Sequence, residues 1–279
     1  MTDLQTRVVT GVIFGIVLIG SILLKEFAFP LLLVFLIIAG LWEFIRVMKA
    51  NGIFPNPVFI YATNLLVFFC SIYLPLSESS LGITSQEIIY FSAGFSGLIF
   101  FLLAAELFRA HPKPAENIGS SLLSVFYIGF PLSLLLLSSI DKNGSFDPVR
   151  ILFFFFFMWA SDTGAYFTGR AFGKHKLLER LSPKKTVEGF IGGVVTAMVT
   201  GIAAWYFLGG IPFWGWMLTG VLMSVSATLG DLVESMFKRQ AGIKDSGKIL
   251  PGHGGILDRF DSAFLSAPVF FFVLKICNI

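Results

Sequence analysis

Hydrophobic residues in this chain gather in long runs that short polar connections separate. A helix that crosses a bilayer needs about 20 mostly apolar residues, and runs of that length recur from Arg7 to Ile276. Their limits predict nine membrane-spanning helices, with no room between them for a soluble domain. The predicted spans are residues 7–24, 27–48, 57–76, 87–108, 118–140, 149–171, 188–209, 212–236 and 255–277.

Composition supports the same class of protein. Of the 279 residues, 56% are hydrophobic and only 13% are charged, whereas soluble domains typically carry about 25% charged residues. We therefore expect an all-α fold, a polytopic integral membrane helical bundle that forms a single membrane domain over residues 1–279. Within it, residues 1–140 are predicted to be mainly structural, and residues 149–277 to carry the active site. The first run ends in Leu24-Lys25-Glu26 without a cleavage pattern, so it is predicted to be a retained span and not a secretion signal.

With nine spans, the connections fall alternately on the two sides of the membrane, and basic residues sort unevenly between them. Of the 20 lysines and arginines, all but four fall on the side of the N-terminus. Loops rich in Lys and Arg face the cytoplasm, so the N-terminus and both large basic loops are predicted to be cytoplasmic. The four on the opposite side are Lys25, Lys142, Arg150 and Lys275.

The first five predicted spans contain little polar chemistry. Glu43 and Arg46 lie three residues apart near the end of the second span, and Glu106 and Arg109 repeat this spacing at the end of the fourth. Residues three apart are neighbours on a helix surface. Both pairs are therefore predicted to form local ion pairs.

Ionisable chemistry begins in the sixth span, where Ser161 and Asp162 interrupt an apolar segment. A charged residue at the bilayer centre costs about 2.5–3.5 kcal/mol even on insertion scales, so it normally faces a bundle interior or an aqueous cavity. Asp162 is therefore a candidate site residue. A structural hydrogen bond between spans is the alternative.

The loop after the sixth span combines basic and hydroxyl side chains just before a predicted helix start. Two lysines, two hydroxyls and free backbone N–H groups at a helix N-terminus would suit a phosphate. Basic cytoplasmic loops also serve topology and anionic lipid headgroups, which remains an alternative. The candidate substrate-binding residues here are Ser182, Lys184, Lys185 and Thr186.

Small and polar residues follow one face of the eighth span at helical spacing. They are Gly220, Ser224, Ala227, Asp231, Ser235 and Lys238. Asp258 and Asp261 share a face at the start of the ninth span. Clustered carboxylates take up protons or bind a cation, and Mg²⁺ prefers oxygen ligands together with substrate phosphates. We predict an Mg²⁺ site, with room for a second cation, among Asp231, Asp258, Asp261 and Asp162.

The stretch from Ser235 to Asp261, between these spans, resembles the signature of the phosphatidate cytidylyltransferases, also called CDP-diacylglycerol synthases. Ser161-Asp162 and the Ser182 to Gly189 segment also resemble that family. The resemblance covers the C-terminal half in motif and the whole chain in architecture. The matching residues are Ser235, Phe237-Lys238-Arg239, Lys244-Asp245, Gly247, Leu250-Pro251, His253-Gly254-Gly255-Ile256 and Asp258-Arg259-Phe260-Asp261.

The resemblance implies a membrane enzyme of phospholipid biosynthesis that converts CTP and phosphatidic acid to CDP-diacylglycerol and pyrophosphate. It also implies a homodimer. We expect membrane lipids as partners, no nucleic acid, and a place in the bacterial cytoplasmic (inner) membrane with the active site facing the cytoplasm.

Roles for single residues follow as hypotheses. Asp231 and Asp258 would hold Mg²⁺, with Asp261 or Asp162 as a further ligand and Ser235 one helical turn from Asp231. His253 would donate a hydrogen bond to the leaving group or shape its loop, and Lys244-Asp245 would form a loop-fixing pair or contact the nucleotide. The lipid phosphate would be received, or the CTP site completed, by Lys184, Lys185 and Thr186. The triphosphate would be stabilised by Lys238, Arg239, Lys244 and Arg259.

Two other classes of function remain open. A CTP-dependent lipid alcohol kinase would use the same nucleotide, cation and membrane, but would release CDP. A transporter or channel would use the acids as a crossing site, and the lack of an internal repeat weakens that interpretation.

Overall fold

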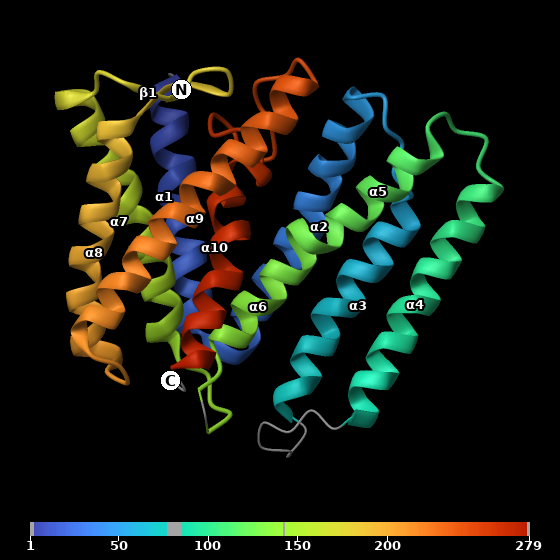
Figure 1. Ribbon diagram of the computed structural model, residues 1–279, viewed down its shortest axis with the longest axis horizontal. Coiled ribbons are helices and arrows are strands. Elements are labelled where there is room, and N and C mark those ends of the chain that lie inside the picture. Colours follow the sequence, from blue (N-terminus) through green and yellow to red (C-terminus); the bar gives the residue numbers. More distant parts are fainter. Residues whose placement is uncertain (1–2, 77–84, 142, 278–279) are drawn as a thin grey trace.

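The computed structural model describes residues 3–76, 85–141 and 143–277. Its helices stand roughly side by side, and their arrangement can be followed in Figure 1. They are α1 (Asp3–Leu23), α2 (Lys25–Ala50), α3 (Pro57–Leu76), α4 (Ser85–Leu107), α5 (Pro114–Ser124), the π-helical turn η1 (Val125–Gly129), α6 (Phe130–Ser138), α7 (Pro148–Phe172), α8 (Val187–Leu208), α9 (Phe213–Gln240) and α10 (Leu257–Ile276).

The helices coincide with the predicted apolar runs to within a few residues. Because α5, η1 and α6 form one continuous rod, the described residues contain nine helical segments, one for each run. Six are long and apolar enough to cross a membrane: α1, α2, the α5–α6 rod, α7, α8 and α9. The helical membrane bundle is thus confirmed. The crossing of all nine segments and the orientation of the N-terminus stay predictions, and Lys142, which was used for that orientation, lies outside the described residues.

Local chemistry explains where the helices begin in the C-terminal half. The Asp147 carboxylate accepts a hydrogen bond from the N–H of Val149 at 2.9 Å, and Pro148 occupies the first turn of α7. The Thr186 hydroxyl accepts one from the N–H of Gly189 at 3.1 Å and caps α8. Such caps satisfy backbone donors that have no partner inside the helix.

The α7–α8 connection folds into a small hairpin that the all-α prediction did not include. Strand β1 (Lys176–Leu178) pairs in antiparallel fashion with β2 (Ser182–Thr186), and Leu178 lies opposite Ser182. The predicted phosphate-binding loop is therefore ordered as the second strand of this hairpin, immediately before α8.

Small residues bring α7, α8 and α9 into close contact. A Cβ atom built at Gly164 on α7 would meet the side chain of Thr196 on α8, and one at Gly192 would meet Thr168. At Gly220 on α9, a Cβ atom would meet the backbone of Ala197. Contacts of this kind let helices approach closely in membranes, and the contact at Gly220 agrees with the small-residue face predicted for the eighth span.

Helix α10 lies at the centre of the bundle and packs on α9, α6, α7, α2 and η1. Phe260, Phe264 and Phe270 on this helix are fully buried. The ring of Phe270 lies edge to face on Phe154 of α7, with centroids 5.6 Å apart. A helix enclosed by other helices does not have to be apolar toward lipid, which explains how α10 can carry several charged residues.

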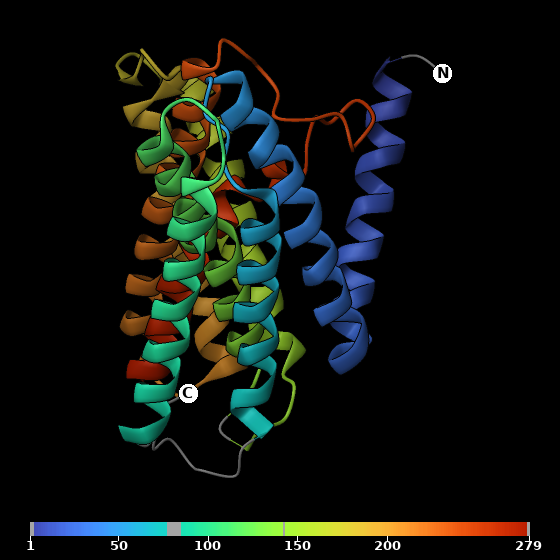
Figure 2. The same cartoon turned by 90° about the vertical axis from the view of Figure 1, so that its right-hand side faces the viewer.

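The polar connections gather at one end of the bundle. The start of α1, the hairpin and the end of α9 are all at the top of Figure 1, and the end of α10 is at the bottom. The segment 241–256, which joins α9 to α10 and is called the signature loop below, extends sideways to α1 in Figure 2. The site is therefore to be sought at this end.

Candidate active site

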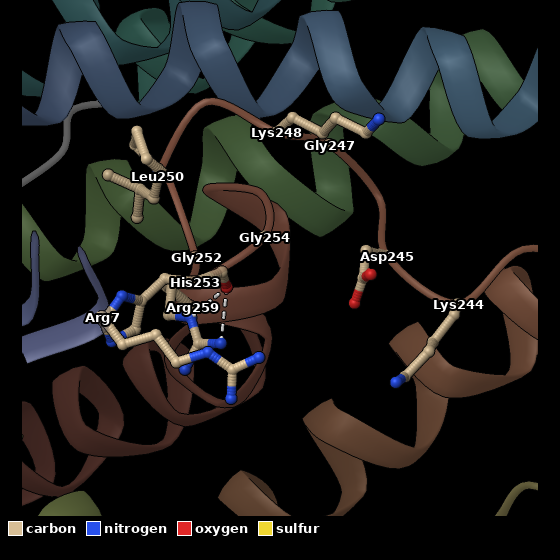
Figure 3. Close-up of a pocket in the computed structure, with 11 residues that line it drawn as sticks. Arg7, Lys244, Asp245, Gly247, Lys248, Leu250, Gly252, His253, Gly254 and Arg259 are labelled. Carbon is tan, nitrogen blue, oxygen red and sulfur yellow. Dashed lines mark hydrogen bonds between the residues drawn. The ribbon is translucent and has the colours of Figure 1, made fainter. Parts of the chain in front are cut away.

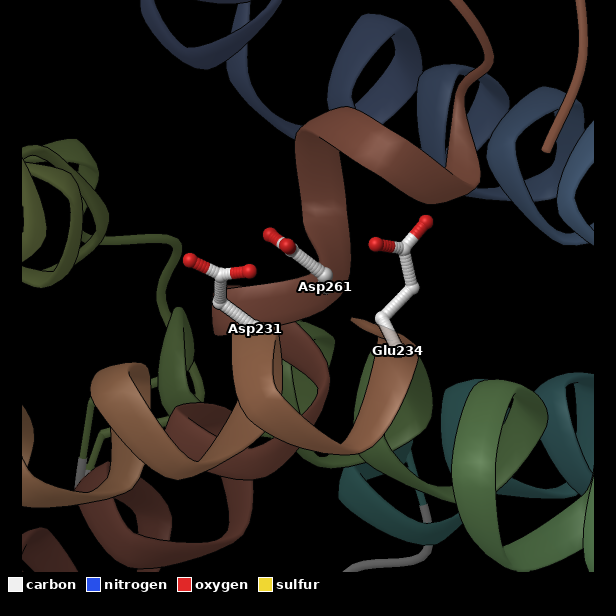
Figure 4. A group of neighbouring side chains, drawn as sticks. All are labelled: Asp231, Glu234 and Asp261. Atoms are coloured by element: carbon white, nitrogen blue, oxygen red, sulfur yellow. The ribbon is translucent and has the colours of Figure 1, made fainter. Parts of the chain in front are cut away.

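Three carboxylates from α9 and α10 meet at the polar end of the bundle. Asp231, Glu234 and Asp261, called the carboxylate cluster below, each place an oxygen within 4.8 Å of the others. Figure 4 shows Asp261 projecting between the other two. The helices can approach here because Gly230 has no side chain: a Cβ atom there would meet the backbone oxygen of Asp261.

Two lysines neutralise part of this negative charge. Lys185 from the hairpin forms an ion pair with Asp231, so this candidate phosphate-binding residue lies beside the predicted metal ligand of α9. Lys238 pairs with Glu234 and, at 2.7 Å, with the Asp258 carboxylate. Carboxylates and ammonium groups therefore alternate across the site.

Asp258 was expected beside Asp231 as a metal ligand, but its carboxylate has other partners. Besides Lys238, it accepts hydrogen bonds from the N–H of Ser246 at 3.0 Å and of Gly255 at 2.7 Å. Asp258 thus ties the signature loop at Ser246 and at Gly255 to the start of α10. Glu234, which was not among the predicted metal ligands, lies beside Asp231 and Asp261 instead.

Asp162 and Ser161 occupy different environments although they are adjacent. The Asp162 side chain is exposed on α7, and its charged neighbours are Lys185 and Asp231. The Ser161 hydroxyl is buried against that of Ser224 on α9 at 2.7 Å. Asp162 therefore borders the site, whereas Ser161 joins two helices.

The remaining predicted residues lie around this centre. Ser235 donates a hydrogen bond to Asp231 at 3.3 Å. Thr186 caps α8, and the Lys184 side chain is exposed. Ser182 lies in β2, opposite Leu178 of β1. The Arg239 guanidinium donates to the backbone oxygen of Leu181 at 3.4 Å and so joins α9 to the hairpin.

A second feature at this end is a cavity of about 470 Å³ between α1 and the signature loop, called the basic pocket below. Among the described residues no ion pair joins Lys244 to Asp245, so the predicted loop-fixing pair is absent there. Figure 3 shows the charged and titratable residues of the lining, which are Arg7, Lys244, Asp245, Lys248, His253 and Arg259.

His253 shapes the signature loop and also lies in this pocket. Its backbone oxygen accepts two hydrogen bonds from the Arg259 guanidinium, at 2.9 and 2.6 Å. Burial lowers the pKa of the His253 ring, and the positive charges of Arg259 and Arg7 lower it further. The ring is therefore neutral at neutral pH.

Sequence reasoning missed the role of Glu43 on α2. This side chain is 0% exposed and accepts hydrogen bonds from the N–H of Leu257 at 2.8 Å and from the Ser246 hydroxyl at 3.2 Å. The predicted ion pair with Arg46 is wrong, because Arg46 lies over the Trp42 ring instead, 6.0 Å from its centroid. An acid within an apolar span was the signal that could have identified it.

Tyr127 is a second residue of the N-terminal half that reaches the site. It lies on the π-helical turn η1, is buried, and packs on Phe237 of α9 and Phe264 of α10. Such turns occur often at functional sites. In contrast, the predicted Glu106–Arg109 pair is confirmed at 2.7 Å and remains local.

The donor set of the carboxylate cluster fits a hard divalent cation. All three residues offer carboxylate oxygens, and among the described residues the only ion pair of the buried Glu234 is with Lys238. Mg²⁺ is usually bound by one or two carboxylates plus substrate phosphates. Asp231, Glu234 and Asp261 are the described residues that could share such a cation.

These observations define a class: a helical membrane protein whose bundle carries carboxylates and lysines together at one end. Residues 5–277 match the model of the cytidylyltransferase family, and the chain belongs to that family. Cytidylyltransferases are nucleotidyltransferases, so the protein is an enzyme of this class.

Curated relatives agree with the family. The chain is 34% identical over 280 residues to the phosphatidate cytidylyltransferase of Bacillus subtilis, covering 99% of both chains. It is 34% identical over 290 residues to that of Haemophilus influenzae, covering 97% of this chain and all of the relative. With the Staphylococcus haemolyticus phosphatidate cytidylyltransferase it shares 41% identity over 181 residues, 64% of this chain and 65% of the relative.

Proposed function

We propose that this enzyme is a phosphatidate cytidylyltransferase, which converts CTP and phosphatidic acid to CDP-diacylglycerol and pyrophosphate. The observation that carries the proposal is the meeting of Asp231 and Asp261 with Lys185 and Lys238 at the polar end of a membrane bundle. That end lies where a nucleotide from water and a phosphate from the membrane surface can meet. End-to-end similarity to enzymes of that name supports the choice of substrates.

The reaction needs positioning and charge neutralisation more than proton transfer. An oxygen of the lipid phosphate attacks the α-phosphorus of CTP, the bond to the β-phosphate oxygen breaks, and pyrophosphate leaves with those electrons. A phosphate monoester is already anionic at neutral pH, so no side chain has to remove a proton. Catalysis then rests on in-line alignment and on stabilisation of the phosphate charge.

We further propose that Asp231, Asp261 and Glu234 hold Mg²⁺, and that Asp258 and Asp162 adjoin it, where a second cation could also bind. Bound there, Mg²⁺ would offset negative charge on the phosphates. As a direct ligand, Asp258 would first have to open its ion pair with Lys238.

Lys185 and Lys238 are placed to exchange carboxylates for phosphate oxygens. Each ammonium group now pairs with an acid of the site, and the three donors of a lysine can be shared among several acceptors. We propose that both lysines contact the phosphates of the bound substrates, and that Arg239 and Lys184 add positive charge at the rim.

We also propose that the enzyme lies in the cytoplasmic membrane as a homodimer, with this end facing the cytoplasm. The unequal distribution of lysine and arginine supports the orientation. Cross-linking in membranes would test the dimer, and labelling of single cysteines from each side would test the orientation.

A direct assay tests the proposed reaction. Purified enzyme should release pyrophosphate from CTP only when phosphatidic acid and Mg²⁺ are both supplied. Release of CDP with a lipid alcohol would favour the kinase, and nucleotide-independent flux in liposomes would favour a transporter. Pyrophosphate release that does not depend on phosphatidic acid would contradict the proposal.

A further inference from the structure

The basic pocket carries more positive charge than its surroundings neutralise. Four cationic residues and one carboxylate, Asp245, line it, and His253 is neutral. Among the described residues, no hydrogen bond or ion pair joins the side chains of Arg7, Lys244 or Lys248 to a partner. Concentrated charge of one sign in a concave site attracts ligands of the opposite sign.

Arg7 reaches the pocket because one face of α1 rests on the signature loop. A Cβ atom at Gly252 would lie 2.9 Å from Arg7, and one at Gly11 would lie 3.3 Å from the His253 ring. Residues 7 and 11 are one helical turn apart and so share this face. Other sides of α1 are exposed, with Val12 at 55% and Ile16 at 66%.

The basic pocket is also distinct from the carboxylate cluster. The lysines of the cluster, Lys185 and Lys238, are paired with acids. The basic pocket instead contains more cationic side chains than carboxylates. A cavity of about 470 Å³ has room for a phosphate-bearing group. Arginine and lysine together are the usual donors to phosphate oxygens.

The family resemblance already assigns Lys244 and Arg259 to phosphate; we propose that Arg7 of α1 is a further ligand of a substrate phosphate bound in the basic pocket. The inference rests on the proposed function, which supplies two sources of phosphate: the polyphosphate of the nucleotide and the phosphate monoester of the lipid. Arg7 therefore places the N-terminal helix in the substrate site. The test separates the two sources.

The first experiment replaces Arg7 by Gln and by Lys, with Arg46→Gln as the control, because Arg46 is exposed and lies over Trp42. Loss of one charge-assisted contact should raise KM about ten-fold or more, and Lys should recover part of the loss. A raised KM for CTP assigns the pocket to the nucleotide, and a raised KM for phosphatidic acid assigns it to the lipid. Unchanged KM values for both substrates would overturn the proposal.

A binding measurement keeps the test independent of turnover. Thermal stabilisation of the detergent-solubilised enzyme is measured in EDTA with inorganic pyrophosphate, and separately with short-chain phosphatidate against the matching diacylglycerol. One phosphate probe should stabilise the wild type and fail to stabilise Arg7→Gln. If the wild type and Arg7→Gln are stabilised equally by each probe, Arg7 is not a phosphate ligand and the proposal is wrong. An inactive wild type that shows Arg7-dependent stabilisation would instead contradict only the proposed function.

A second pair of variants tests the docking of α1 without removing charge. Leucine at Gly11 would push the His253 ring and the signature loop away from α1, whereas Gly15 has nothing within 4 Å of its added Cβ atom. Gly11→Leu should raise the same KM as Arg7→Gln, and Gly15→Leu should behave as the wild type. Wild-type kinetics in Gly11→Leu would contradict the role of this contact.

Discussion

The two halves of the bundle use polar residues in different ways. Helices α7 to α10 and their connections carry the carboxylate cluster, its lysines and close contacts through glycine. Helices α1 to α6 are mainly apolar, yet each of α1, α2 and η1 sends one polar side chain to the site: Arg7, Glu43 and Tyr127. The C-terminal half thus carries most of the clustered charge, and the N-terminal half contributes single polar side chains to the same end of the bundle.

The largest expected effect concerns the carboxylate cluster. Asp231→Asn or Asp261→Asn should lower kcat by at least about 100-fold, the scale on which loss of one charge-stabilising group slows an enzyme. Glu116→Gln is the matched control in the other half, because Glu116 forms only an exposed pair with Lys113. Pyrophosphate release measures the effect, and near-normal activity in both aspartate variants would remove the metal assignment.

Glu43 tests whether the N-terminal half supports the site. Glu43→Ala leaves the N–H of Leu257 and the Ser246 hydroxyl without their buried acceptor, which should cost about 1–3 kcal/mol in the free energy of unfolding. Activity should fall as well, because the signature loop loses its anchor, and Glu43→Gln should be milder.

The control for Glu43 lies on the same helix, since Glu26 is exposed. Thermal unfolding and kcat are measured together for Glu43→Ala and Glu26→Gln. If Glu43→Ala matches Glu26→Gln in both quantities, the supporting role of α2 is wrong.

Glycine substitutions compare the packing of the halves. Gly230→Ala adds a Cβ atom against the backbone of Asp261 and should destabilise the protein by about 1–3 kcal/mol, as overpacking does. Gly97→Ala on α4 meets nothing within 4 Å, so it should be neutral or stabilise by up to about 1 kcal/mol. The melting temperatures of the two variants measure the difference. Equal shifts in Gly230→Ala and Gly97→Ala would show that the two halves are packed equally closely at these positions.

The smallest expected effect is on His253. Burial and the charges of Arg259 and Arg7 lower the pKa of its ring. In Arg7→Gln one of those charges is gone, the protonated form is less disfavoured, and the pKa should rise toward the ordinary value of about 6.5. Histidine NMR titration measures it, and a further fall in the pKa would contradict the contact.

The sequence predicted most of the fold because hydropathy reports directly on which segments can enter a membrane. The helix limits and the small-residue face followed from spacing, whereas the part of Lys185 in the site was a hypothesis that followed from the family resemblance. It did not reveal that Glu43 turns from Arg46 to the start of α10, because that choice depends on backbone N–H groups more than 200 positions away. The hairpin was missed because its two strands span only three and five residues.

The placement of the metal ligands shows the same limit. Helical periodicity identified Asp231 and the acids of α10, but it could not say which carboxylate would be taken by the signature loop. Asp258 accepts hydrogen bonds from Ser246 and Gly255, whereas Asp261 faces Asp231. Only the crossing of α9 and α10 at Gly230 decides between them.

The most direct measurement of the central claim follows the phosphorus atoms of CTP. The enzyme is supplied with phosphatidic acid, Mg²⁺ and CTP labelled at either the α- or the γ-phosphate, and the lipid and aqueous products are separated. The proposed reaction transfers the α label to the lipid, leaves the γ label in pyrophosphate, and fails in Asp231→Asn. Transfer of the γ label to the lipid, or unchanged transfer in Asp231→Asn, would contradict it.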